Sequence, residues 1–168
     1  SDLFKNKKIN EITTLELDSH FSFKSKEEYF SFIYEEFPMH IFGHASSSEM
    51  TTFNDLNDFY TMFRDENEIV IISDEMGKSK PATLFFLSKF GCLIESINFY
   101  NSVTKDKILS SFDLIVTSNP DIIINYSDKL NVIKYDTVYN KQVNSENSIH
   151  SLKDLSEKVK EIQHAKTI

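Results

Sequence analysis

The stretch Ile69-Val70-Ile71-Ile72 decides the fold class, and a polar loop, residues 73–79, follows it directly. Four β-branched residues in succession, with charge before them and polar residues after them, are typical of a β-strand. A strand that is apolar at every position is usually covered on both faces, as in a parallel sheet between helices. We therefore predict a central, buried strand over residues 69–72.

Helices and further strands are expected to alternate on both sides of this strand. The sequence predicts helices at residues 25–37, 49–63, 82–90, 105–111 and 151–163, and strands at residues 39–42, 92–99, 113–117 and 130–135. Such alternation is typical of an α/β protein. We expect a three-layer α-β-α sandwich with a mostly parallel sheet of four to five strands, although the topology of residues 121–148 stays open.

The length of the chain fits one domain. We assign residues 1–24 to a lead-in segment and residues 25–168 to a single α/β sensor domain. The chain begins with Ser1 rather than Met, which is compatible with a piece of a longer protein. No apolar run approaches the roughly 18 residues of a membrane span, so we expect no membrane partner.

The formal net charge of −8 argues against direct contact with nucleic acid, because binding to phosphates needs clustered Lys and Arg. DNA contact is therefore expected only through a separate domain. The single cysteine, Cys92, excludes an internal disulfide and fits a reducing compartment, so we expect a cytoplasmic location.

Two polar loops are expected directly after predicted strands, and the carboxyl ends of parallel strands are where ligands gather. A serine-rich loop that leads into a helix offers N–H and O–H donors to a phosphate, and glycine permits a close approach. The alternative is that these serines only cap helices. The candidate ligand-binding residues are Gly43, Ser46, Ser47 and Ser48 in the first loop and Ser73, Gly77, Lys78 and Ser79 in the second.

Other chemistry is less well supported by the sequence. The Gly77-Lys78-Ser79 run ends like a nucleotide-binding loop, but Ile72 occupies the position of its first glycine, which disfavours ATP hydrolysis. We take the five histidines to form no i, i+4 pair and no cluster with Cys92, so we predict no metal site and no cofactor. No pair of acid–base residues stands out, and an enzyme is therefore the less favoured class.

The runs HIFGHASSS (40–48) and IVIISDEMGKSK (69–80) resemble the sugar isomerase (SIS) domain, in particular the sensing domain of RpiR-type bacterial transcription regulators. The resemblance implies that Ser46, Ser47, Ser73 and Ser79 hold the phosphate of a small phosphorylated sugar. It also implies a homo-oligomer that regulates genes of carbohydrate metabolism. A phosphosugar isomerase of the same fold is the alternative within this family.

A rival resemblance begins at Glu68 and runs to the C-terminal helix. The order of strand, polar loop, helix and further strands is similar to the EIIB-like module of phosphotransferase-linked regulators of the PRD/Mga type. In that module the loop carries a phosphate-accepting cysteine at the strand end, where this chain has Ser73. The resemblance implies a regulatory interaction domain that no longer carries phosphate. We favour the phosphosugar-sensing effector domain of a transcription regulator and keep the EIIB-like module as the alternative.

Overall fold

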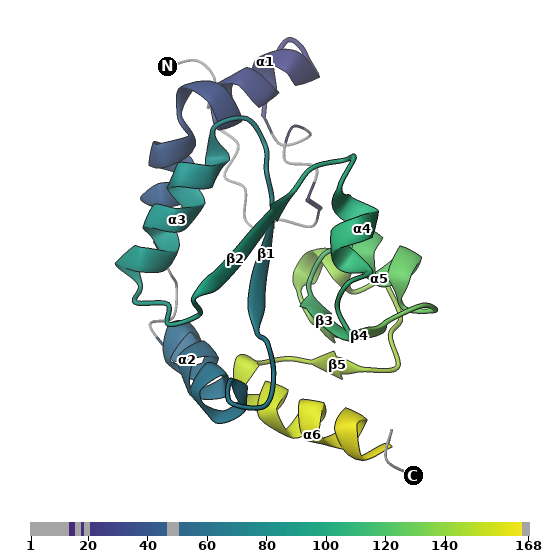
Figure 1. Cartoon of the computed structure of the whole chain (residues 1–168). Coiled ribbons are helices and arrows are strands. Elements are labelled where there is room, and N and C mark those ends of the chain that lie inside the picture. Colours follow the sequence, from purple (N-terminus) through teal and green to yellow (C-terminus); the bar gives the residue numbers. More distant parts are fainter. Residues whose placement is uncertain (1–13, 16–17, 19–20, 47–50, 166–168) are drawn as a thin grey trace. The chain divides into compact units, whose positions relative to one another are not determined.

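The computed structural model describes residues 14–15, 18, 21–46 and 51–165 (Figure 1). The chain forms two compact units. One consists of Lys24–Asp106, and the other combines Lys107–Ile168 with Ser1–Phe23. We describe each unit by itself, and the prediction of a single domain over residues 25–168 stays a prediction.

The unit of residues 24–106 contains one pair of parallel strands. Strand β1 lies opposite β2, with Val70 opposite Ser96 and Asp74 opposite Tyr100. In Figure 1, helix α3 runs along one side of this pair. The elements are α1 (Lys26–Phe30), π-helices η3 (Ser31–Glu36) and η4 (Met39–Gly43), α2 (Thr51–Phe63), β1 (Val70–Asp74), α3 (Ser79–Lys89) and β2 (Ser96–Tyr100); α4 (Lys105–Leu109) follows at the unit boundary.

Aromatic side chains form much of the core of this unit. The ring of Phe53 on α2 stacks on Phe90 at a centroid distance of 5.2 Å and meets Phe86 edge-on at 5.9 Å. The helical spacing of the apolar residues in α2 accounts for this contact, because residues three and four apart share one face. The predicted helix therefore exists, although residues 49–50 at its expected start lie outside the described part of the chain.

The strand predicted at residues 39–42 is wrong, because this segment is the π-helix η4. Pro38 already has helical angles, φ −60° and ψ −39°, and the His44 N–H donates to the Met39 carbonyl at 2.9 Å. A short apolar run does not distinguish a buried strand from a buried helical turn. Here the helical turn packs against α3.

The strand at residues 69–72 is confirmed as β1, but it is not central in its sheet. Among the described strands it pairs only with β2, and its residues are half-buried or exposed rather than covered on both faces. Strand β2 also begins later than predicted. The Asn57 side chain bonds the Gly91 carbonyl and the Leu93 N–H, both at 2.9 Å, so the backbone there is paired before the strand starts.

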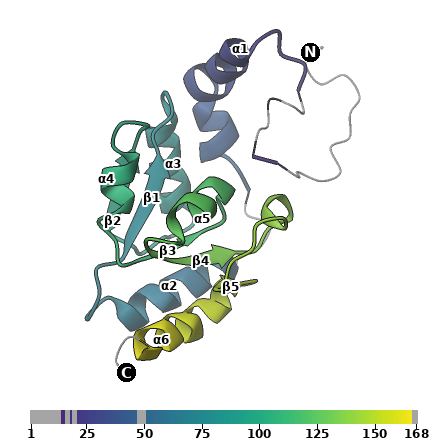
Figure 2. The ribbon, with the colours of Figure 1, turned by 90° about the vertical axis from the view of Figure 1, so that its right-hand side faces the viewer.

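The unit that contains residues 107–168 has a sheet of three parallel strands. Strand β4 lies between β3 and β5, and Figures 1 and 2 show α5 and α6 on opposite sides of this sheet. The elements are β3 (Leu114–Thr117), α5 (Pro120–Tyr126), β4 (Asn131–Tyr135), a 3₁₀-turn η5 (Val138–Asn140), β5 (Ser148–Ile149), a 3₁₀-turn η6 (Leu152–Asp154) and α6 (Leu155–Ala165).

Helix α5 and strand β5 are the two elements that the sequence reading left open. Helix α5 has a common N-terminal cap. The Asn119 side chain accepts from the Asp121 N–H at 2.9 Å, and Pro120 occupies the first turn. Aliphatic side chains from the strands and helices fill the core of this unit. Its buried hydrophobic residues are Leu109, Ile115, Ile122, Ile123, Tyr126, Val132, Ile133, Ile149, Leu155 and Val159.

The predicted α/β class is confirmed, and every described strand pair is parallel. The helices around the strands are compatible with an α-β-α sandwich. The strands are divided between sheets of two and three, and each sheet is smaller than the sheet of four to five that we expected. In the described part of the chain, no helix combines the length and the apolar character needed to cross a bilayer.

Candidate functional site

Half of the candidate residues predicted from the sequence lie around the turn from β1 to α3: Ser73 is in the strand, Gly77 and Lys78 are in the loop, and Ser79 is the first residue of the helix. Ser79 is buried at the start of α3, and its hydroxyl accepts a hydrogen bond from the Met76 N–H at 3.2 Å. Its carbonyl accepts from the Thr83 hydroxyl at 3.3 Å. The Ser79 hydroxyl therefore binds a backbone N–H of the loop that precedes α3, and it does not cap the helix, whose N-cap residue is Lys78.

Gly77 and Lys78 hold this loop against η3. Gly77 has a φ of +52°, and a side chain there would lie 2.9 Å from the Tyr34 carbonyl. The Lys78 N–H donates to that same carbonyl at 2.8 Å. The Lys78 ammonium lies 3.5 Å from the Glu35 carboxylate, with 71% of the lysine side chain exposed. The only lysine of the loop thus already has an acidic partner.

An acidic group and two phenols lie at the end of β1. Burial raises the pKa of Asp74, and the positive charge of Lys105 acts against this rise. Burial also raises the pKa of Tyr34 and of Tyr100, and the charge of Asp74 adds to both shifts. Ser73 donates only a long hydrogen bond of 3.4 Å, to the Asp74 carbonyl. The negative potential of Asp74 disfavours an anion at this strand end.

The first predicted loop does not follow a strand, because η4 precedes it. Gly43 is buried, and a side chain there would meet the Met39 sulfur at 2.5 Å and the Phe85 ring at 3.3 Å. This glycine therefore allows η4 to pack closely on α3. Ser46 is exposed, and Ser47 and Ser48 lie outside the described residues. None of the contacts that the structure describes joins this loop to the loop after β1.

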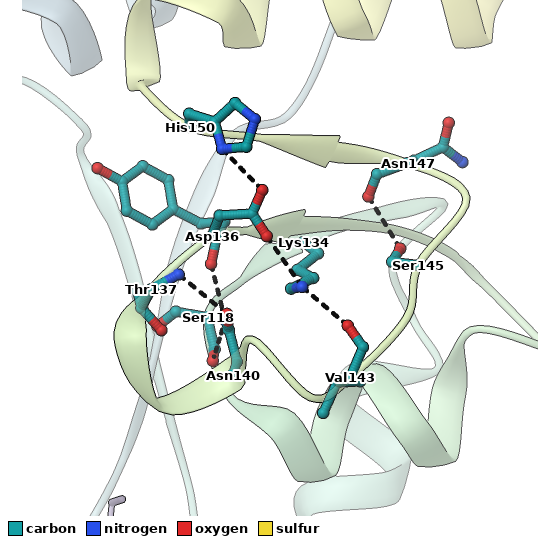
Figure 3. A network of polar contacts seen from close by, with 10 residues as sticks. Ser118, Lys134, Asp136, Thr137, Asn140, Val143, Ser145, Asn147 and His150 are labelled. Carbon is teal, nitrogen blue, oxygen red and sulfur yellow. Dashed lines mark hydrogen bonds and ion pairs between the residues drawn. The ribbon is translucent and has the colours of Figure 1, made fainter. Parts of the chain in front are cut away.

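A second polar centre lies at the carboxyl ends of β4 and β5, and Figure 3 shows it. The buried Lys134 ammonium lies 2.9 Å from one Asp136 oxygen and donates to the Val143 carbonyl at 2.8 Å. The other Asp136 oxygen lies 2.8 Å from Nδ1 of His150, whose side chain is 83% exposed. One carboxylate therefore joins a buried cation to a surface imidazole.

Asn140 is the fully buried member of this centre. Its amide nitrogen donates to the Ser118 carbonyl at 2.9 Å and to the Tyr135 carbonyl at 2.8 Å, and its oxygen accepts from the Thr137 N–H at 2.9 Å. The residue thereby ties together the segments that follow β3 and β4. The Thr137 hydroxyl is buried beside it and makes no hydrogen bond of good geometry with any described residue.

The sequence analysis missed this second centre. Ser118 directly follows β3, Asp136 directly follows β4 and His150 directly follows β5. The strand-end rule that selected the two serine-rich loops would also have selected Ser118 and Asp136, whereas β5, the strand before His150, was not predicted. A buried lysine inside a strand, Lys134, has no comparable signal in the sequence, because lysine side chains are almost always exposed unless a partner is present.

The Asp136–His150 pair has the form of an oriented imidazole, in which a carboxylate fixes one ring nitrogen and leaves the other exposed. Catalysis of acyl transfer would need a nucleophile within reach of that nitrogen. The Ser118 hydroxyl instead accepts from the Tyr139 hydroxyl at 2.8 Å. Among the described residues, no group of three or more His, Cys, Asp or Glu side chains could hold a metal ion.

Comparison with protein-family models, with curated proteins and with solved structures gives no match for this chain.

Proposed function

We propose that this chain is a regulatory interaction module of a bacterial transcription regulator, of the EIIB-like kind, and that it acts by binding a partner protein rather than by catalysis. The observation that carries this proposal is the order of elements from β1 onward. Strands and helices alternate through β1, α3, β2, α4, β3, α5 and β4, and the described strands are parallel throughout. The segment before β1 is helical wherever it has regular structure and is described.

The chemistry of the β1 strand end supports binding over phosphate transfer. An EIIB-like phosphate carrier needs a thiol at this position, and the chain has Ser73. Glu75 is exposed beside Asp74, whose carboxylate is partly desolvated, so this strand end offers an acidic surface to a basic partner. Charge complementarity of this kind sets the rate and specificity of association.

The experiment is a titration of the chain with purified phosphoryl-carrier proteins of the phosphotransferase system. We expect saturable binding by one of them, and Glu75→Lys should weaken it about tenfold, as expected for a charge at an interface. Glu66→Lys is the matched control, because Glu66 is also an exposed acid of the same unit but lies beyond the end of α2. Absence of binding, or equal weakening by both variants, would contradict the proposal.

Sensing of a phosphorylated sugar is the second candidate, and the start of α3 favours it. The helix has 11 residues, and the residue before it, Lys78, makes no side-chain capping hydrogen bond. The first N–H groups of such a helix attract anions. Lys78 could turn from Glu35 toward a phosphate, because this exposed ion pair is held weakly.

A melting-temperature screen against ketose and aldose phosphates distinguishes the two candidates. The sensing candidate predicts stabilisation that is lost in Lys78→Ala and kept in Lys129→Ala, where an exposed lysine of the other unit is changed. The interaction module predicts no stabilisation by any sugar phosphate. Interconversion of the two sugar classes would instead indicate a phosphosugar isomerase.

A further inference from the structure

The helical turn η4 places two histidines side by side. His40 and His44 are four residues apart, and their ring centroids are separated by 6.3 Å. The prediction of no metal site is based on the premise that no two histidines are four residues apart, and His40 and His44 contradict that premise. In a strand, residues four apart lie on one face but roughly 13 Å apart, too far to share an ion.

The π-helical form of η4 brings these two side chains onto nearly the same face. The hydrogen bond from the His44 N–H to the Met39 carbonyl spans five residues, which defines a π turn. In such a turn, as in an α-helix, positions four apart lie close together on one face. π turns are rare and often occur at functional sites.

Packing fixes the position of both rings while leaving them open to solvent. The His44 ring lies 5.2 Å from the Phe85 ring of α3, and the His40 ring meets Phe37 edge-on at 6.0 Å. Both histidines are exposed residues. Gly43 lets the turn pack closely on α3, so the backbone between the two histidines lies against that helix.

We propose that His40 and His44 form a two-histidine site for a divalent transition-metal ion of the Zn²⁺, Ni²⁺ or Cu²⁺ class. Imidazole nitrogen is a preferred ligand for these ions, and two histidines four apart on a helix are a known metal-binding arrangement. With Zn–N bonds of about 2.0–2.1 Å, two imidazoles on one tetrahedral ion have centroids about 5 Å apart. Side-chain rotations that shorten the observed distance between the ring centroids by about 1 Å reach this geometry.

Water completes the coordination, because the pair supplies two protein ligands. The formal net charge of the chain, −8, favours the approach of a cation. One local charge acts against it, since the Lys89 ammonium donates to the Ala45 carbonyl, next to His44, at 3.2 Å. The site is therefore expected to bind the ion more weakly than a site with three or four protein ligands.

The test is calorimetric titration of the untagged chain with NiCl₂, ZnCl₂ and CuCl₂, each metal alone. We expect one ion per chain, and His40→Gln and His44→Gln should each lower the affinity at least about tenfold, because each removes one of two ligands. His150→Gln is the matched control, an exposed histidine that is held by Asp136 instead. Binding that survives both variants, or no binding by the unchanged chain, overturns the proposal.

A second measurement needs no variant and so does not depend on how the variants fold. In side-chain NMR spectra of the histidines, Zn²⁺ should shift the imidazole signals of His40 and His44 together and leave those of His150 in place. Shifts that are equal for all histidines, or that are confined to His150, overturn the proposal as well.

Discussion

The two units use the carboxyl ends of their parallel strands in different ways. At the end of β4, the polar side chains bind one another and the backbone. Two of them, Lys134 and Asn140, are buried. At the end of β1, the polar groups are mostly exposed, and one of them, Asp74, has a pKa raised by burial. A polar strand end can therefore stabilise the fold or remain open for recognition. The hydrogen bonds of its side chains distinguish the two cases.

The largest expected effect comes from breaking the closed network, with Asn140→Ala. This substitution leaves two carbonyls and one N–H without their buried partner, so we expect a loss of about 3 kcal/mol in the free energy of unfolding. Denaturant unfolding followed by circular dichroism measures it. The control is Asn144→Ala, an exposed position with an expected effect within about 0.5 kcal/mol. Equal effects at the two positions would mean that the network does not stabilise the fold.

A smaller effect on the free energy of unfolding is expected from Gly77→Ala, which disturbs the contact between the loop after β1 and η3. The substitution adds a side chain at a φ of +52° and places it 2.9 Å from the Tyr34 carbonyl, so we expect a loss of about 2 kcal/mol. Gly91→Ala is the matched control, because Gly91 has a similar φ of +67° but nothing lies within 4 Å of the added group. Strain alone predicts a loss of about 1 kcal/mol there. A loss at Gly91 as large as at Gly77 would show that contact with η3 contributes nothing.

The smallest effect concerns the charge at the open strand end and depends on pH. Because the folded chain raises the pKa of Asp74 above 3.8, it binds this proton more tightly than the unfolded chain does. This contribution is present at low pH and is lost as pH rises through the raised pKa. Asp74→Asn should therefore flatten the pH dependence of stability above pH 3.8 and raise the relative stability at neutral pH.

Absorbance titration of the tyrosines gives a second test of the same group. Removal of the Asp74 charge should lower the pKa of Tyr34 and Tyr100 toward the ordinary value, while their burial keeps part of the rise. Asp128→Asn, an exposed acid of the other unit, is the control and should leave both the stability profile and the tyrosine titration unchanged. The opposite sign of the stability change would mean that attraction to Lys105 outweighs the cost of burying the Asp74 charge.

The fold class could be predicted from the sequence because local pattern determines it. The β-branched run at residues 69–72 and the caps around Pro120 are local signals, although only the first was used. The segment Met39–Gly43 could not be assigned in this way, since its apolar residues fit a strand or a buried turn equally well. Its packing on Phe85 of α3, more than 40 residues along the chain, selects the turn.

The candidate sites were predictable only in part, for a related physical reason. Serine after a strand is visible in the sequence, but whether its hydroxyl faces a ligand or a backbone N–H depends on the loop geometry, as Ser79 shows. The Lys134–Asp136–His150 contacts join residues of β4 and β5, whose pairing the sequence left open. The spacing of His40 and His44 is present in the sequence, and the prediction of no metal site overlooked it.

Strand β5 has one further consequence, for self-association. It has only two residues, Ser148 and Ile149, and it forms an edge of the three-stranded sheet. Exposed edge strands are the usual templates on which other chains add in aggregates, and short edges are one of the ways in which proteins prevent it. An outer strand of this length presents few unpaired backbone groups to a neighbouring molecule, so this border of the sheet is a poor starting point for fibrils.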